Sequence, residues 1–370
     1  MGTFVLHQRA YYHCSTCRGG HCPADAAFGL GAADLTAGAE QLAVLFGTTA
    51  SFAEAAQKLL PKASGLRLAE STVERATEAA GQRLGEALAA GQTFGGAARW
   101  IWPRDASGRT VAYVSVDATG VPIQGPGGVE AEGRMAWVGK VFAPKPEAKD
   151  AKDAKDDVAA VRRPAAAGHA RYLAGLMGLD ELGDPLRRQA AQVGMDRAQQ
   201  WVALSDCGSG IDDFLRVNFP RAVRIADFYH VAEHLGDLAK AWHPGDPEAA
   251  QDRAGRWAHT RKHQGGRAVL TELEALDRAG RSEAAVEVYR QVVRYIGNHA
   301  DRMDYPSYRA SGWQIGSGHI EAACKTVVNE RMKRSGMRWG EDGADAVCHL
   351  RALFKGDAEQ WEAFWRPSIN

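Results

Sequence analysis

The segment TVAYVSVDATGVPI, residues 110–123, decides the fold class, because its side chains alternate as they do in a β-strand. The odd-numbered residues from Val111 to Asp117 fall on one face of this strand, and Val114 and Val116 fall on the other. We therefore expect Asp117 at the end of a buried strand. The turn residues GPGG and the strand-like run MAWVGKVFAP follow, which predicts an antiparallel neighbour.

Two later segments repeat a pattern of strand, turn and helix. QQWVALSDCGSGIDDFLRVNFP (199–220) places Asp206 at the end of a strand, and RAVRIADFYHVAEHL (221–235) places Asp227 and His230 after a shorter one. A helix is expected at about 169–194. Strands that alternate with helices in this way predict an α/β fold with a mixed sheet.

Two further segments are not expected to contribute strands to that sheet. Residues 145–168 are charged, Ala-rich and of low complexity, so we expect a solvated insertion there. Residues 231–300 are strongly helical in pattern and rich in His and Trp.

The N-terminal part, residues 38–92, has helical spacing throughout. Two short helices joined by a Gly-containing turn predict a helix-turn-helix, although an ordinary helical hairpin has the same pattern. Ser71 and Glu74 have the spacing of a capping box. The side chains expected to face outward on the second helix are Thr72, Arg75 and Glu78.

Composition sets few limits on function. The chain has 370 residues, with 45 basic and 45 acidic side chains, so net charge neither indicates nor excludes nucleic-acid binding. No run of about 18 apolar residues is present, and the first residues lack the apolar stretch of a signal peptide. We therefore expect a cytoplasmic, nucleoid-associated protein that does not span a membrane.

Three cysteines lie close together in YYHCSTCRGGHCPAD, residues 11–25. Cys14 and Cys17 form a CxxC turn, and Cys22 follows, which is a spacing that can bind Zn²⁺. A complete site needs four ligands, and no second knuckle is present in the sequence. The alternative is the remnant of a zinc ribbon whose other half lies upstream of the start of this chain.

A third acidic residue opens a helix in GWQIGSGHIEAACK, residues 312–325. Glu321 follows a Gly-Ser-Gly turn, where an acid also stabilises the positive end of a helix dipole. Together with Asp117 and Asp206, however, it could hold two Mg²⁺ or Mn²⁺ ions, which prefer hard oxygen ligands. Two strand-end aspartates followed by a helical glutamate are the layout of an RNase H-like nuclease or transposase core.

The C-terminal part of the chain resembles the DDE transposases of ISKra-type insertion sequences. The resemblance rests on the Ile-Gly-Ser-Gly turn at 315–318, on Glu321, and on the R-x-K-x-x-GMRW block at 331–339. RIADFYHVAEHL and the N-terminal segments YYHCSTCRGGHCPAD and SFAEAAQKLL also resemble the family. The resemblance implies that Asp117, Asp206 and Glu321 are its metal-binding triad.

Two departures from the family pattern are visible. The family usually reads Asp-Gly-Ala where this chain has DCGSG at Asp206. It also usually begins further upstream with another cysteine knuckle, so we expect either a truncated copy or a misassigned start here.

Further site residues follow from the same comparison. His230 would lie near the active site, or would simply make a local hydrogen bond at the start of a helix, and Asp227 would position it or cap that helix. A basic run near Glu321 would contact DNA phosphates, or would be a solvated helix face; it consists of Lys325, Arg331, Lys333, Arg334 and Arg338. Trp313 and Trp339 could stack on unpaired bases, but core packing is the simpler expectation.

These expectations define an organisation and three hypotheses. The expected regions are a partial zinc knuckle (1–30), a helical DNA-binding region (31–98), an RNase H-like core in two parts (99–230 and 306–370) and an all-helical insertion (231–305). The first hypothesis is an oligomeric transposase acting on terminal inverted repeats and target DNA. The alternatives are an inactive relative that binds element ends as a repressor, and a stand-alone nuclease.

Overall fold

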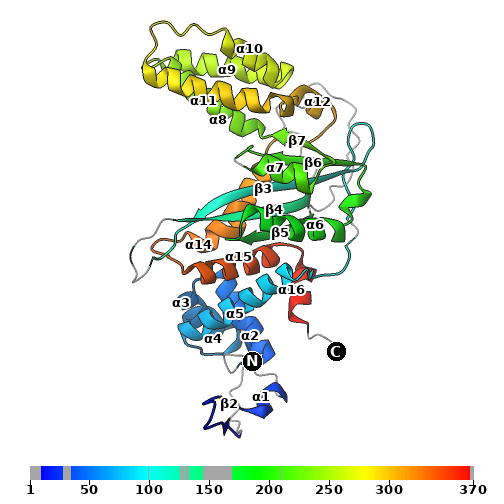
Figure 1. Cartoon of the computed structure of the whole chain (residues 1–370), viewed down its shortest axis with the longest axis vertical. Helices are drawn as coiled ribbons and strands as arrows, with labels where there is room; N and C mark the ends of the chain where they lie inside the picture. Colours follow the sequence, from blue (N-terminus) through cyan, green and yellow to red (C-terminus); the bar gives the residue numbers. More distant parts are fainter. Residues whose placement is uncertain are drawn as a thin grey trace.

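The computed structural model describes residues 10–27, 35–98, 100–125, 129, 133–144, 169–208 and 210–366. The charged segment 145–168 and most of the GPGG turn lie outside these residues. Figure 1 shows a helical region at one end of the molecule, a twisted sheet in the middle, and the N-terminal helices and cysteine hairpin at the other end. No helix of the described residues is long and apolar enough to cross a membrane.

A five-stranded mixed sheet forms the centre of the fold, as the sequence predicted for an α/β protein. Its spatial order is β5-β4-β3-β6-β7, with β3, β4 and β5 antiparallel and β3, β6 and β7 parallel. The strands are β3 (Val111–Val121), β4 (Arg134–Ala143), β5 (His169–Gly175), β6 (Gln200–Ser205) and β7 (Ala222–Ala226).

The register of β3 decides where the acidic residues lie. The parallel pairing of β3 with β6 ends at Ser115 opposite Leu204, whereas the antiparallel pairing with β4 continues to Val121. Asp117 therefore lies just beyond the last parallel pair rather than at the end of its strand. Asp206 directly follows β6, so both acids lie toward the carboxyl ends of the parallel strands.

The helix predicted at about 169–194 is wrong in its first part. Residues His169–Gly175 form the edge strand β5, and the helix α6 covers only Gly183–Gln192. Leu173 and Ala174 are buried on opposite faces of β5, which pairs with β4 along its whole length. Pairing and two-sided burial override the local Ala-rich pattern, because strand preference depends on tertiary context.

The N-terminal helices are α2 (Ala37–Thr49), a continuous run of α3 (Phe52–Glu54), η1 (Ala55–Leu59) and α4 (Leu60–Ser64), and α5 (Glu70–Ala89). The predicted capping box is wrong, because α5 begins at Glu70 after Ala69 and has no side-chain cap. Ser71 therefore lies inside the first turn. The helix α5 packs closely on the core, since a Cβ at Gly81 would lie 2.2 Å from the carbonyl oxygen of Ala346.

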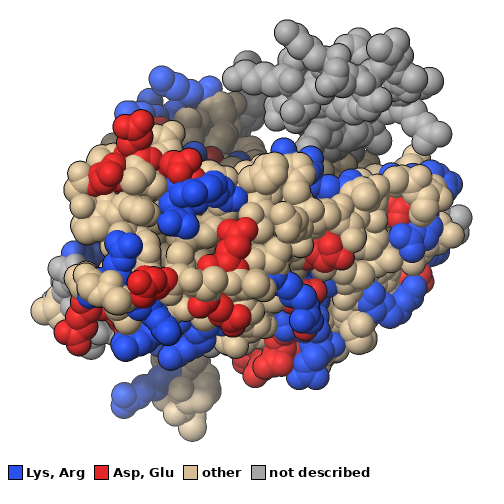
Figure 2. Space-filling view, turned by 90° about the horizontal axis from the view of Figure 1, so that it is seen from above, with Lys and Arg blue, Asp and Glu red and all other residues tan. Residues whose placement is uncertain are grey.

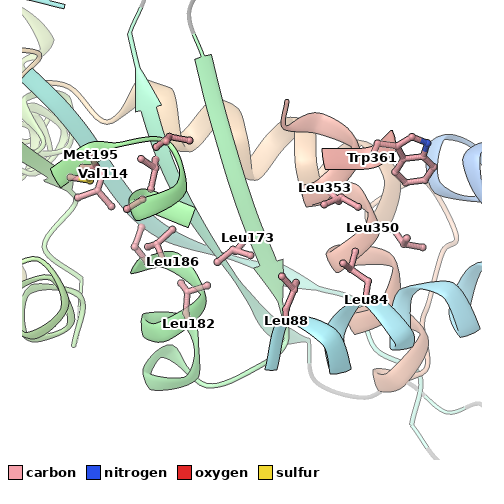
Figure 3. Packing of buried hydrophobic residues seen from close by; sticks show 14 of the residues in the cluster. Leu84, Leu88, Val114, Leu173, Leu182, Leu186, Met195, Leu350, Leu353 and Trp361 are labelled. Atoms are coloured by element: carbon pink, nitrogen blue, oxygen red, sulfur yellow. The ribbon is translucent and has the colours of Figure 1, made fainter. Parts of the chain in front are cut away.

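One face of the sheet, with Val114 and Leu173, packs on a core that joins it to α5, α6, α7 (Ile211–Asn218), α15 (Glu341–Lys355) and α16 (Ala358–Trp365). Figure 3 shows this core in a row from Met195 and Leu186 to Leu84 and Trp361. The N-terminal helices are thus part of the same hydrophobic core as the sheet.

The opposite face carries Asp117 and is covered by two groups of helices. A continuous helical run packs on Val121 and Val138; it consists of α13 (Gly318–Ala323), η6 (Cys324–Asn329) and α14 (Glu330–Met332). The insertion packs beside it on Tyr113 and Leu204. The insertion is helical as predicted, with α8 (Phe228–Trp242), α9 (Pro247–Gln264), α10 (Gly266–Glu274), α11 (Glu283–His299) and the short α12 (Tyr305–Ala310).

The remaining elements are short. The cysteine hairpin consists of β1 (Tyr12–His13) and β2 (Gly20–His21), followed by α1 (Pro23–Ala27). Single 3₁₀ turns are η3 (Leu179–Leu182), η4 (Met195–Arg197) and η5 (Ala300–Arg302).

Candidate functional site

The three predicted acids come from separate elements and influence one another electrostatically. Asp117 is half-buried on β3, Asp206 follows β6, and Glu321 is exposed on the first turn of α13. Burial raises the pKa of Asp117, and the negative charges of Asp206 and Glu321 raise it further. Two donors oppose this rise: the Ala118 N–H at 2.7 Å and the Cys324 thiol at 3.5 Å.

The donor set fits a hard divalent cation, because it offers three carboxylates and their charges repel one another in the absence of a cation. The side chains are not drawn together to coordination distance. Among the residues that the structure describes, no three His, Cys, Asp or Glu side chains form a group that could hold a metal ion. Binding of a cation by all three acids would therefore require side-chain movement, and Glu321 is exposed.

The turn before Glu321 is attached to the sheet and to α8 by hydrogen bonds. The Gln314 N–H donates to the Tyr113 hydroxyl at 3.3 Å, and the Ile315 carbonyl accepts the Phe228 N–H at 2.9 Å. Gly316 lies close to Tyr229, because a Cβ there would lie 2.7 Å from the Tyr229 ring, which would have to move. These contacts fix the direction in which α13 leaves the sheet.

A buried lysine completes this attachment. Lys140 of β4 donates its ammonium to the His319 carbonyl at 3.0 Å and lies 4.6 Å from the ring centroid of Phe142. Its side chain is buried, and burial lowers the pKa of Lys140 to about 8. Lys140 thus connects the central sheet to the first turn of the helix that carries Glu321.

The lowered pKa of Lys140 predicts a change of stability with pH. Between pH 8 and pH 10.5 the folded protein releases this proton before the unfolded chain does, so the unfolded state binds more protons and stability rises with pH. We expect the free energy of unfolding of the wild type to rise by up to about 3 kcal/mol over this range relative to Lys140→Met. Urea titrations at several pH values measure the difference, and parallel profiles of the two proteins would contradict it.

The loop that holds Asp206 contains a strained residue. Cys207 has a φ of 62°, in the left-handed region that favours glycine, and it is buried. The Gly208 N–H donates to Asp206 Oδ1 at 2.8 Å, and the Tyr295 hydroxyl of α11 donates to the Asp206 carbonyl at 2.8 Å. The family pattern, Asp-Gly-Ala, has glycine at the position where this backbone needs it.

A pair of substitutions tests the strain at Cys207. We expect Cys207→Gly to be about 1 kcal/mol more stable than Cys207→Ala, because only glycine adopts the left-handed conformation without a penalty. At a right-handed helical position the order is the reverse. The midpoints of urea denaturation decide between the two, and an Ala variant at least as stable as the Gly variant would show that the loop is unstrained.

His230 belongs to a cluster of aromatic rings rather than to a pair with Asp227. Its Nε2 lies 3.1 Å from Nε2 of His234, and its Nδ1 lies 3.4 Å from the carboxylate of Glu233. Both imidazoles lie against Tyr295, whose hydroxyl reaches the loop of Asp206. A catalytic role for His230 stays a prediction, and Asp227 does not position it through a hydrogen bond.

The predicted basic run divides into exposed and buried members. Lys325, Lys333, Arg334 and Arg338 are exposed, and the Lys333 ammonium donates to Thr119 at 2.9 Å, two residues beyond Asp117 on the same face of β3. Arg334 lies 3.4 Å from the carboxylate of Glu54.

Arg331 contradicts the prediction of a DNA contact, because it is 1% exposed. Its guanidinium lies 4.7 Å from the ring centroids of both Phe52 and Trp339, and its Nε donates to the Gly47 carbonyl at 3.0 Å. Trp339 is also buried, as expected for core packing. Trp313 is half-buried and stacks on Tyr308.

The predicted DNA-binding residues of α5 differ in exposure. Arg75 is exposed and donates to the Ser71 carbonyl at 3.2 Å, whereas Thr72 is half-buried. Glu78 does not face outward: it is half-buried against Gly343 of α15, and burial together with Glu74 and Asp342 raises its pKa.

The cysteine hairpin forms a tight turn. The Cys17 N–H lies 3.5 Å from the Cys14 sulfur, and such backbone donors lower the pKa of Cys14, favouring the thiolate that binds metals. Cys14 and Cys17 are exposed, and Cys22 is less so. The three thiols do not form a metal-holding group among the described residues, so zinc binding stays a prediction.

Charges at the insertion end of the molecule are mixed. Figure 2 shows Lys and Arg side chains interspersed with Asp and Glu on this face, without a continuous basic surface among the residues that are coloured. This arrangement does not favour the insertion's end as a surface for DNA.

Three residues that position or surround the site were missed from the sequence. Ser317 contacts Glu321 and Asp227, Lys140 donates to the His319 carbonyl, and Tyr229 is 64% exposed beside the turn. A serine between two glycines was the only local signal for Ser317. Nothing local indicates the partners, which lie 90 or more residues away.

The chain matches no protein-family model, and no curated protein matches it significantly. The resemblance to ISKra-type transposases therefore rests on the motifs quoted above and stays a hypothesis.

Proposed function

We propose that the chain is a DNA transposase of the DDE class with an RNase H-like core. The observation that carries the proposal is that Asp117, Asp206 and Glu321 lie over one sheet face, near enough that the charges of Asp206 and Glu321 raise the pKa of Asp117. The strand order, with three antiparallel strands continued by two parallel ones, supports an RNase H-like core.

In this proposal Asp117, Asp206 and Glu321 hold the cations. Bound there, Mg²⁺ or Mn²⁺ would activate the attacking oxygen and stabilise the leaving oxygen in an in-line displacement. Lys333, held beside Thr119, and exposed Lys325 are near enough to the helix of Glu321 to contact the phosphates of the bound strand. The Cys324 thiol and the Ala118 N–H orient the Asp117 carboxylate.

The proposed reaction has two displacements at phosphorus. In the first, the oxygen of water bonds to the phosphorus at the element's end, the bond to the 3′ oxygen breaks, and that oxygen leaves as a 3′ hydroxyl. In the second, this 3′ hydroxyl loses its proton and attacks a phosphodiester of target DNA, which releases a new 3′ hydroxyl on the target. Each step exchanges one P–O bond for another.

Cleavage and strand transfer on labelled DNA that carries the element's inverted repeats test the proposal, with Mg²⁺ or Mn²⁺ in one series and EDTA in another. Metal-dependent cutting and joining are the expected result. Cutting without joining would favour the stand-alone nuclease, and binding of the repeats without cutting would favour the DNA-binding repressor.

A further inference from the structure

Asp227 is completely buried and uses its two carboxylate oxygens for different purposes. Oδ1 accepts the Tyr229 N–H at 2.7 Å and so caps α8. Oδ2 accepts the hydroxyl of Ser317, which lies 90 residues further along the chain. A buried carboxylate requires donors for both oxygens, and capping alone satisfies only one of them.

Ser317 does not do what a serine in its position normally does. It is the N-cap residue of α13, where a serine hydroxyl usually accepts a backbone N–H of the first turn. Its side chain makes no such bond. The hydroxyl instead lies between Asp227 and Glu321, with its oxygen 2.8 Å from Glu321 Oε1.

A serine hydroxyl has one proton, so it cannot donate to two carboxylates at once. We propose that Asp227 is a positioning residue for Glu321: it attracts the Ser317 proton and thereby leaves the Glu321 carboxylate free for a divalent cation. This inference rests on the proposed function, because it assigns Glu321 the role of a cation ligand.

The amide of Asp227→Asn reverses this arrangement. Its oxygen still accepts the Tyr229 N–H, while its NH₂ group donates to the Ser317 oxygen. The Ser317 hydroxyl then donates its hydrogen bond to Glu321, and this bond keeps the Glu321 carboxylate beside the turn instead of free for the cation. We expect the apparent Kd for Mn²⁺ to rise about tenfold.

The mechanism requires Ser317, which allows a double-mutant test of binding. In the Ser317→Ala background, Asp227→Asn should change the Kd for Mn²⁺ less than about twofold, because the intermediary is absent. Calorimetric titration of the four full-length proteins measures this coupling. An equal effect of Asp227→Asn with and without Ser317 would show that Asp227 acts only as a cap or a charge, and the proposal would be wrong.

A second test needs no metal. In EDTA, Glu321→Gln should raise the urea midpoint, because its amide donates to the Ser317 oxygen while the hydroxyl donates to Asp227. In the Ser317→Ala background this gain should disappear. The proposal is wrong if Glu321→Gln does not raise the urea midpoint, or if it still raises the midpoint in the Ser317→Ala background. This comparison does not use Asp227→Asn, so it remains decisive if that variant does not fold.

The two tests separate this inference from the proposed function. If Asp117→Asn binds Mn²⁺ as the wild type does, the proposed cation site fails. The EDTA comparison then still decides whether Ser317 is shared between Asp227 and Glu321.

Discussion

Replacing Glu321 with Gln is expected to abolish metal-dependent strand cleavage while the fold is retained. Glu321 is exposed at the first turn of α13 and lies within the electrostatic influence of Asp117. The amide has nearly the same shape but no charge, so it is a poor ligand for Mg²⁺ or Mn²⁺. We expect a loss of cleavage rate of at least about 10³-fold, equivalent to about 4 kcal/mol of transition-state stabilisation.

The control for this substitution is Glu330→Gln, which makes the same chemical change further along the same helical run. Glu330 is exposed and lies near Arg351 and Lys355, at 3.6 and 3.7 Å, instead of the triad. Its cleavage rate should remain within about twofold of the wild type, because Glu330 is not one of the three acids and buried Arg351 keeps its hydrogen bonds to the Val327 and Thr326 carbonyls. Cleavage by Glu321→Gln at the wild-type rate would remove Glu321 from the proposed site.

Arg331→Ala should lower the free energy of unfolding by about 3 kcal/mol or more. The substitution empties the space beside Phe52 and Trp339, whose rings contact each other edge to face, and leaves the Gly47 carbonyl without the Arg331 donor. Phe52 belongs to the N-terminal helices and Trp339 to the C-terminal block, so the substitution weakens the packing between two regions of the chain. Urea denaturation followed by Trp fluorescence measures the effect.

Lys325→Ala provides the matched comparison from the same basic run. Lys325 is exposed, so its removal should change stability by less than about 0.5 kcal/mol while weakening DNA binding and reducing its salt dependence. Arg331→Met keeps the packing of the stem and should be less harmful than Arg331→Ala. A stable Arg331→Ala protein with a specific loss of DNA affinity would restore the original prediction of a phosphate contact.

Local patterns were sufficient for the elements that carry two of the acids. Local sequence identified β3 and the strand before Asp206. In each strand successive side chains point to opposite faces of the sheet, and both faces are buried. Helical spacing identified the insertion. The capping residue Asp227 was among the alternatives, since it stands between a strand and a helix and makes its first hydrogen bond two residues away.

The errors come from interactions between distant residues. The segment His169–Gly175 is a strand because β4 pairs with it, and no pattern within seven residues reveals that partner. Arg331 was predicted to contact DNA because it belongs to a basic run near Glu321, but it is buried against the rings of Phe52 and Trp339, which are distant in the sequence. Ser317 and Asp227 meet only after the turn before α13 has packed on α8.

The hydrogen bond from Tyr295 to the Asp206 carbonyl joins two distant parts of the molecule mechanically. Tyr295 belongs to α11, which extends through the insertion at one end of the molecule (Figure 1). A rotation of this helix must either break the bond or carry the Asp206 loop with it. A partner that binds the outer end of the insertion and rotates α11 would therefore act on the main chain of Asp206 itself.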